Sequence, residues 1–302
     1  MLAELSHREL IKLAQKRCIP PLLPKFHKGQ SGGRVCIIGG CEDYTGAPYF
    51  SANATALMGC DLTHVICEYN AGTVIKSYTP NLMVHPYLRM SNTKLDVDMD
   101  EQRKKINSLL DRIHVVVIGP GLGRDPLMLK SIKDIIRYIL EKHEGKIPLV
   151  IDADGLFLVT QDSEVKEMLK SYPKGRVILT PNVVEFKRLC DAIGKKGDSH
   201  SEMGSLIAQE LNCQGDTLTG AISCMLAFSR AMYDFKICDQ EEKGESNDKP
   251  LKNWVDYAML SCYAGCTITR ECSRLGFKAK GRAMQTTDLN DRVGEVFAKL
   301  FG

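Results

Sequence analysis

The sequence predicts an α/β fold in which a central, mostly parallel sheet is flanked by helices on both faces. Three observations support this prediction. Short apolar, β-branched runs alternate with segments of helical apolar spacing along the 302-residue chain. The runs are continuously apolar, which is typical of strands buried on both faces of a parallel sheet. Several runs end in glycine or aspartate, and parallel sheets place ligand sites beyond the carboxyl ends of their strands.

The first 30 residues are predicted to form an amphipathic helix and a proline-rich strap. Leucines recur near helical spacing from Leu2 to Leu13. Prolines at positions 20, 21 and 24, together with Gly29, then end regular structure. We therefore expect residues 1–30 to precede a single domain that spans residues 31–302.

Within this domain the apolar runs are predicted to be strands, at residues 35–38, 65–67, 114–118, 148–152 and 177–180. Residues 74–75 are a weaker candidate for a strand. Helical spacing, small residues or a capping residue predict helices between and after these strands: residues 49–60, 125–140, 182–188, 199–211, 216–227, 254–269 and 287–300, the last capped by Asp288. Residues 239–250 are rich in charge and are expected to form a surface loop.

Composition excludes several classes of protein. The 40 Lys and Arg residues against 37 Asp and Glu residues leave a net charge of +3, too small to indicate binding to nucleic acid or to an anionic membrane. A hydrophobic content of 44% excludes a disordered chain. The 12 cysteines are scattered without a C-x-x-C pair, so we expect free thiols in a reducing compartment and no zinc site. No segment has the pattern of a secretion signal or a membrane span, and we therefore expect a cytoplasmic protein.

The segment Gln-Gly-Asp-Thr-Leu-Thr-Gly at residues 214–220 is the first candidate for chemistry. Gly215 permits close approach of a ligand, and the first N–H groups of the helix that follows have no partner within the helix. Such a helix start suits a phosphate group, and Asp216 beside it would act as a base for an incoming hydroxyl. Taken alone, these residues favour the simpler interpretation that Asp216 is a helix N-cap.

A glycine-rich turn, Gly-Pro-Gly-Leu-Gly at residues 119–123, follows the most apolar predicted strand. It is not a dinucleotide fingerprint, because Arg124 stands where that motif requires glycine. Two interpretations are equally favoured: a flat turn against which a large ligand lies, and a tight connection between strand and helix.

Two further strand ends carry polar residues. Asp152 and Asp154 would hold Mg²⁺ through water molecules, or else satisfy backbone donors and cap the next helix. Asn182 and Glu185 have capping-box spacing, and the alternative is a second set of donors that faces a ligand.

Taken together and in order, these motifs resemble the ATP-dependent NAD(P)H-hydrate dehydratases, in particular their eukaryotic, fungal branch. The resemblance covers nearly the whole chain. It rests on Gly39-Gly40 with Tyr44-Thr-Gly-Ala-Pro48, Gly119-Pro-Gly-Leu-Gly123, Asp152-Ala-Asp-Gly155, Thr180-Pro-Asn182 with Glu185-Phe186, and Gln214-Gly-Asp216-Thr-Leu-Thr-Gly220. It implies a ribokinase-like fold of three layers, with the active site along one edge of the sheet.

The resemblance also implies an activity, in which a carbon–oxygen lyase repairs hydrated NADH or NADPH at the expense of ATP and Mg²⁺. Asp216 would take the proton from the hydrate hydroxyl as that hydroxyl attacks the γ-phosphate. Gln214 and Gly215 match the ATP-binding segment, and no side chain is assigned as a metal ligand. The hydrate-binding positions, besides Asp216 itself, are Gly121, Asn182, Val183, Val184, Glu185, Phe186, Lys187 and Arg188.

One part of the chain departs from the family. Members contain further strands and turns, some of which contact ATP, between the helix that matches residues 199–211 and the helix that begins near Asp216. Here residues 211–214 join the two predicted helices directly. We therefore expect an internal deletion near residues 212–214, exposed apolar surface at the sheet edge and weak ATP binding.

Two alternative functions stay open at this point. One is a kinase for a vitamin or sugar, which would stop at the phosphate ester, and the other is a catalytically weak nucleotide-binding protein. The choice between NADH hydrate and NADPH hydrate and the assembly into a homo-oligomer are also open.

Overall fold

The computed structural model describes residues 2–23, 31–94, 98–192, 215–237 and 251–302. Six strands form one parallel sheet in the order β3-β2-β1-β4-β5-β6. Their bounds are β1 Arg34–Ile38, β2 Leu62–Glu68, β3 Met83–Leu88, β4 Val115–Ile118, β5 Leu149–Ile151 and β6 Val177–Leu179. Strand order reverses between β1 and β4, and in sheets of this order a crevice opens beyond the carboxyl ends of the two strands.

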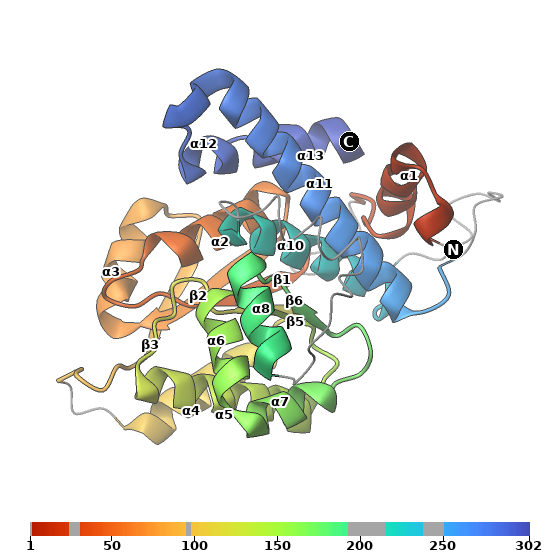
Figure 1. The fold of residues 1–302 in the computed structure, drawn as a ribbon. Coiled ribbons are helices and arrows are strands. Elements are labelled where there is room, and N and C mark those ends of the chain that lie inside the picture. The colour runs from red at the N-terminus through yellow and green to blue at the C-terminus, as the bar shows by residue number, and fades with distance from the viewer. Residues whose placement is uncertain (1, 24–30, 95–97, 193–214, 238–250) are drawn as a thin grey trace.

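Helices cover both faces of the sheet (Figure 1). One face carries α2 (Gly46–Leu57), α10 (Gly215–Tyr233) and, beyond α10, the long α11 (Trp254–Lys280). The other face carries α4 (Met99–Leu110), α5 (Pro126–His143), α6 (Ala153–Gln161) and α7 (Ser163–Lys170). The predicted α/β architecture with a parallel sheet between helical layers is therefore confirmed.

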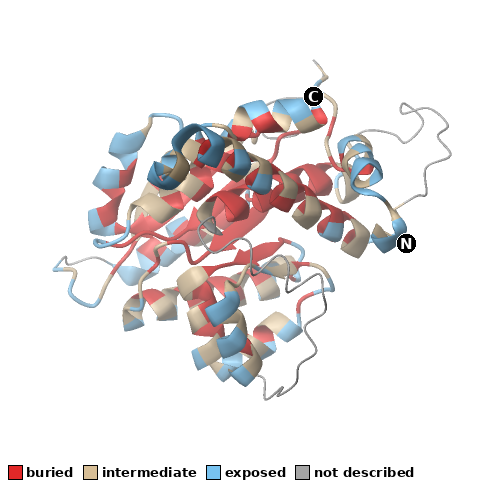
Figure 2. Cartoon of the chain, turned by 45° about the horizontal axis from the view of Figure 1, so that its top comes forward, coloured by how far each residue is buried: buried red, intermediate tan, exposed pale blue. Residues whose placement is uncertain are grey.

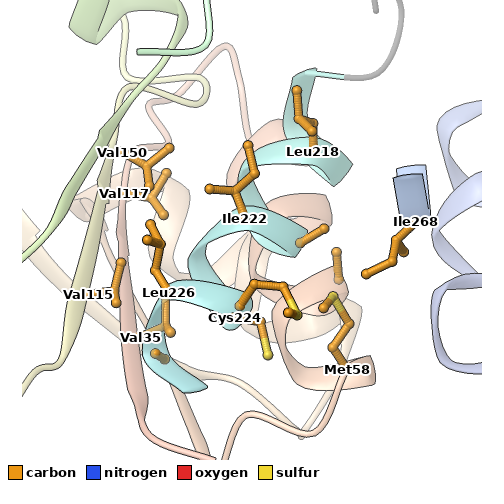
Figure 3. Close-up of a cluster of buried hydrophobic side chains, with 14 of the residues drawn as sticks. Val35, Met58, Val115, Val117, Val150, Leu218, Ile222, Cys224, Leu226 and Ile268 are labelled. Carbon is orange, nitrogen blue, oxygen red and sulfur yellow. The ribbon is translucent and has the colours of Figure 1, made fainter. Parts of the chain in front are cut away.

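Two hydrophobic cores result, because successive residues of a strand point to opposite faces of the sheet. In β1, Val35 and Ile37 join the core under α2 and α10, whereas Cys36 and Ile38 join the core under α4 and α5. The central strands of the sheet are buried in the middle of the molecule (Figure 2), whereas the edge strands β3 and β6 are partly exposed. Figure 3 shows how Ile222 of α10 points toward the valines of the sheet.

The contact between α2 and α10 is unusually close and fixes the start of α10. The hydroxyls of Ser51 and Thr219 are hydrogen-bonded at 2.9 Å, and the Thr55 hydroxyl donates to the Gly220 carbonyl at 3.2 Å. A Cβ atom at Gly220 would lie 2.2 Å from the Ser51 carbonyl oxygen, so only glycine allows this approach. The first turn of α10 is thereby held against α2.

Further helices complete the two layers or pack against them. Helix α1 (His7–Arg17) begins with a capping box formed by Ser6 and Glu9, and its buried Leu13 joins the core on the α11 side. Helix α3 (Tyr69–Tyr78) connects β2 to β3, and α8 (Val183–Ala192) follows β6. In the part of the chain that the structure describes, no helix is both long enough and apolar enough to cross a membrane.

The structure corrects some sequence-based predictions. Residues 74–75 lie in α3, whose N-cap Glu68 accepts hydrogen bonds from the amides of Asn70 and Ala71. The edge strand β3 was not predicted, because Pro86 interrupts its pattern. Residues 287–300 form two helices, α12 (Thr286–Asn290) and α13 (Val293–Phe301), and Asp288 lies in the first turn rather than at the cap.

Other predictions agree or fall outside the described residues. Helix α11 extends beyond the predicted end at residue 269, and the helices predicted from residues 49, 125, 182 and 216 are present with shifted ends. The predicted proline-rich strap is described only as far as residue 23. The predicted helix at 199–211 and the charged loop at 239–250 lie outside the described residues.

Candidate functional site

A cavity of about 850 Å³ opens beyond the carboxyl ends of β1 and β4, where the strand order reverses. Residues from five segments far apart in the sequence line it. They are Cys41, Asp43, Tyr44, Thr45, Gly46, Ala47, Met90, Gly121, Gly123, Arg124, Ala153, Asp154 and Asp216. The cavity therefore combines the two glycine-rich turns with the end of β5 and the start of α10.

Two glycine-rich turns, one with Gly39 and Gly40 and the other at residues 119–123, are in close contact beneath this cavity. The amide of Gly40 donates to the carbonyl oxygen of Gly121 at 3.0 Å. A Cβ atom at Gly39 would lie 2.0 Å from the carbonyl oxygen of Pro120. Gly121 has φ of +60°, a left-handed conformation that favours glycine. The turn at residues 119–123 is thus a tight connection that also forms part of the cavity wall, and a ligand lying against it stays a prediction.

Asp216 is the partly buried carboxylate in the first turn of α10, and it faces the cavity. Burial raises the pKa of its side chain from 3.8 to about 6. A carboxylate with a pKa near neutrality is mostly ionised at pH 7 and accepts a proton more readily than an ordinary aspartate. Asp216 is therefore suited to act as a general base.

Asp152 follows β5 and is buried just behind the cavity wall. Burial, and after it the nearby negative charge of Asp216, together raise the pKa of Asp152 to about 7. The Thr180 hydroxyl donates to its Oδ1 at 2.9 Å. A negative charge on Asp216 therefore disfavours ionisation of Asp152, so the neutral form of Asp152 is favoured beside an ionised Asp216.

Asp154 braces the second glycine-rich turn. Its carboxylate accepts hydrogen bonds from the Gly123 amide at 3.0 Å and from Arg124 Nε at 2.9 Å. The residue before it, Ala153, has φ of +45°, which is strained for a residue with a Cβ atom. Such strain persists where the surroundings enforce it, and it is frequent at functional sites.

Asn182 and Glu185 form the predicted capping box at the start of α8. Asn182 Oδ1 accepts from the amides of Val184 and Glu185 at 3.0 and 2.9 Å, and Glu185 Oε2 accepts from the Asn182 amide at 2.9 Å. The donors at this helix start are therefore used within the protein. Val183 and Val184 are exposed.

The structure brings some predicted site residues together and separates others. Gly121 and Asp216 line one cavity, whereas no residue of the segment 182–188 lines it. That segment lies beyond β6 and reaches the site indirectly, since the charge of Glu185 raises the pKa of Asp152. Gly215 begins α10, and Gln214 lies outside the described residues. The roles assigned to these residues stay predictions.

Sequence reasoning missed several lining residues. Arg124 was noted only as the residue that breaks a glycine motif, although its position directly after that turn was a usable signal. Cys41 and Asp43 follow the first glycine pair in the same way. Met90 follows β3, which was itself not predicted, so the sequence carried no clear signal for it.

Comparisons with known proteins agree with this geometry. The family model described as NAD(P)H-hydrate dehydratase matches residues 35–214 and 212–270. A curated protein of Saccharomyces cerevisiae, named ATP-dependent (S)-NAD(P)H-hydrate dehydratase, is 89% identical over 337 positions, which cover all of both chains. A protein of the same name from Phaeosphaeria nodorum is 41% identical over 336 positions, covering all of this chain and 98% of the relative.

Solved structures share the fold. A ribokinase-like superfamily protein from Enterococcus faecalis aligns with a TM-score of 0.63 at 19% identity, covering 98% of this chain and 95% of that chain. The ADP/ATP-dependent NAD(P)H-hydrate dehydratase from Bacillus subtilis, co-crystallised with ATP/Mg²⁺, aligns with a TM-score of 0.57 at 17% identity, covering 96% of this chain and 97% of that chain. The predicted ribokinase-like fold is confirmed.

Proposed function

Because the chain belongs to the family of ATP-dependent (S)-NAD(P)H-hydrate dehydratases, we propose that it is a lyase that removes water from hydrated NADH or NADPH at the expense of ATP. The observation that carries the proposal is the position of Asp216. A carboxylate with a pKa raised to about 6 faces a cavity of about 850 Å³ from the first turn of a 19-residue helix. The kinase alternative is not favoured, because the curated relatives are named as dehydratases.

The start of α10 supports the binding of ATP. The first N–H groups of a helix lack partners within the helix, and the helix dipole places partial positive charge there. Asp216 occupies this first turn and faces the cavity, so the amides beside it lie at the same place. We assign the phosphates of ATP to this helix start, with Gly215 and the neighbouring Gln214 as the segment that approaches them.

Asp216 then serves as the base in the first step. It takes the proton from the hydroxyl group of the hydrate as the oxygen attacks the γ-phosphate of ATP, and the bond between this phosphate and ADP breaks. In the second step the carbon–oxygen bond breaks and inorganic phosphate leaves with the electron pair. The lone pair of the ring nitrogen assists, and loss of a proton from the neighbouring carbon restores the ring double bond. The net products are ADP, phosphate and the reduced cofactor.

The residues present fit an Mg²⁺ ion that accompanies ATP. Mg²⁺ at nucleotide sites is held by one or two carboxylates together with phosphate oxygens and water. Asp43 is an exposed carboxylate of the cavity wall and is the residue that we assign to this role. Asp154 is less suited because it already binds Arg124 and the Gly123 amide. Bound Mg²⁺ would offset the charge that develops on the phosphates.

We assign hydrate binding to Gly121, on the cavity wall, and to the neighbouring segment 182–188 beyond β6. Gly121 supports this assignment because its backbone is free to approach a ring closely. The segment 182–188 is supported by its position next to Asp152, itself beside Asp216. Alanine at position 121 would meet the Tyr44 carbonyl oxygen at 2.9 Å and is expected to impair hydrate binding.

An internal deletion near residues 212–214 is the second part of the proposal. The family model matches in two segments that meet there. The alignment with the 89% identical relative runs over 337 positions against 302 residues here, a difference of 35. Leu179, Val183 and Val184 are exposed beside the edge strand β6. These observations support a weakened ATP site, with the KM for ATP raised above that of full-length relatives.

The test is direct. The protein is incubated with hydrated NADH or NADPH, ATP and Mg²⁺, and recovery of the near-ultraviolet absorbance of the reduced ring is followed together with release of phosphate. We expect recovery in proportion to phosphate released, and loss of both in Asp216→Asn. A stable phosphate ester without absorbance recovery would indicate the kinase instead. No turnover, with thermal stabilisation by the cofactor and none by ATP, would indicate the catalytically weak protein.

A cytoplasmic location is proposed as well. The ten cysteines that the structure describes are free, which is typical of a reducing compartment. Assembly into a homo-oligomer stays a prediction, and sedimentation of the purified chain measures it.

A further inference from the structure

Arg124 follows the second glycine-rich turn and lines the same cavity as Asp216. Its side chain is 55% exposed, yet two contacts fix its orientation. Nε donates to Asp154 Oδ1 at 2.9 Å, and the guanidinium carbon lies 4.3 Å from the centre of the Phe157 ring. An exposed arginine normally samples many rotamers, so this bracing lowers the entropy that it loses on binding a ligand.

These contacts leave the two terminal nitrogens of the guanidinium group available to a ligand. In the described part of the chain, Nε is the atom of this guanidinium that donates to protein, while Nη1 and Nη2 have no protein acceptor. The paired terminal nitrogens of an arginine match the spacing of two phosphate oxygens and bind them in a bidentate manner. Lysine lacks this fork and binds phosphate as a point charge.

Apart from this arginine, the charged side chains that line the cavity in the described part of the chain are acidic. Three carboxylates line the cavity, from Asp43, Asp154 and Asp216, and Arg124 is its single cationic side chain among the described residues. Both substrates of the proposed reaction are polyanions. The phosphates of ATP have the start of α10 and Mg²⁺, whereas the dinucleotide needs a positive group of its own.

We infer that Arg124 binds a phosphate group of the dinucleotide substrate and so sets the affinity for the hydrate rather than for ATP. The hydrate is assigned in preference to ATP because Arg124 directly follows the turn of Gly121, to which hydrate binding is assigned, whereas the phosphates of ATP are assigned to the start of α10. The inference rests on the proposed function. The phosphate is either the pyrophosphate, which NADH and NADPH share, or the 2′-phosphate, which NADPH alone carries.

The experiment compares Arg124→Gln and Arg124→Lys with wild type, measuring KM and kcat for each hydrate and KM for ATP. Loss of a hydrogen-bonded charge pair predicts a rise in hydrate KM of about 10- to 100-fold in Arg124→Gln, with kcat within about twofold and KM for ATP unchanged. Arg124→Lys should recover part of the affinity, and added salt should raise the wild-type KM more than that of Arg124→Gln. Phe157→Leu, which removes the supporting ring, should give a smaller rise.

Arg103→Gln is the matched control, because Arg103 is 57% exposed and pairs with one carboxylate, that of Asp100, away from the cavity. It should behave as wild type. A KM rise for both hydrates assigns the pyrophosphate, and a rise for NADPH hydrate alone assigns the 2′-phosphate. Unchanged hydrate KM values in Arg124→Gln, a rise confined to ATP, or a fall confined to kcat would overturn the inference.

Direct binding separates failure of this inference from failure of the proposed function. NADH and NADPH are titrated into wild type and Arg124→Gln and followed by fluorescence of the reduced ring, which requires no turnover. Weaker binding to Arg124→Gln supports the inference even if wild type does not dehydrate the hydrate. Equal binding overturns it even if wild type is active.

Discussion

Replacing Gly220 with alanine tests whether the contact between α2 and α10 positions Asp216, the proposed base. The new Cβ atom would lie 2.2 Å from the Ser51 carbonyl oxygen and 2.8 Å from the Ala54 Cβ atom. Ordinary contact begins at 3.4 Å, so the helices must separate by about 1 Å. Overpacking of this kind costs up to about 3 kcal/mol, and the higher helix propensity of alanine returns about 1 kcal/mol. We therefore expect a loss of about 2 kcal/mol of unfolding free energy.

The same displacement should also lower kcat. Asp216 lies one helical turn before Gly220 on α10, and a shift of about 1 Å at a reacting group lowers kcat by up to about 100-fold. Urea denaturation measures stability, and the dehydration assay measures kcat. Gly276→Ala is the control, because its Cβ atom meets the flexible Met284 side chain at 3.0 Å. If Gly220→Ala keeps wild-type kcat and gains stability as the control does, close packing does not position Asp216.

Two further predictions use other parts of the structure. In a pH profile, kcat should fall as the pH drops through about 6, because protonation removes the proposed base Asp216. Asp152→Asn should leave this limb in place, because Asp152, whose pKa is raised to about 7, is already mostly protonated where Asp216 titrates; a limb moved by about one pH unit in that variant would contradict this order of protonation. Asp234→Ala leaves two buried arginines without their carboxylate partner and should lower the free energy of unfolding by about 3 to 5 kcal/mol in urea denaturation. Asp100→Ala removes an exposed ion pair and should lower it by about 0 to 1 kcal/mol. Equal losses in the two variants would refute the role of burial.

The last prediction depends on a network that joins β6 to α10. Arg176 makes two hydrogen bonds to the Asp234 carboxylate, at 2.7 and 2.8 Å, and stacks 3.7 Å from the centre of the Trp254 ring. Arg230 donates to the same carboxylate and to the His114 carbonyl oxygen. The arginines keep the pKa of Asp234 below its ordinary value, so this stabilisation is present at neutral pH and is lost as the pH falls through that lowered pKa.

The central strands could be predicted because both of their faces are buried. β4 is fully buried and its sequence, Val-Val-Val-Ile, leaves no other interpretation. The edge strand β3 is half-exposed and contains His85 and Pro86, so it lacks the apolar signal. Helix α3 was mistaken for a strand at residues 74–75 because two β-branched residues are too short a run, while the decisive contact is the cap by Glu68.

The sequence predicted only those residues of the candidate site that belong to a recognisable local motif. Gly121 and Asp216 belong to recognisable motifs, and the cavity confirms that they meet. The pairing of Asp152 with Asp216 depends on how α10 packs against the end of β5, and no local pattern encodes that. The bracing of Arg124 by Asp154 and Phe157 is equally non-local, since it joins the turn after β4 to helix α6.

Strand order explains why these separate residues share one cavity. β1 and β4 are neighbours in the sheet, but the chain leaves them toward opposite sides, through α2 on one face and α5 on the other. The divergence opens the crevice that the two glycine-rich turns line. Helix α10 packs beside α2 on the first face, and α6 lies on the second, so Asp216 and the pair formed by Arg124 and Asp154 approach the crevice from opposite faces of the sheet. The proposed base and the proposed phosphate-binding cation therefore reach one cavity of about 850 Å³ from different layers of the fold.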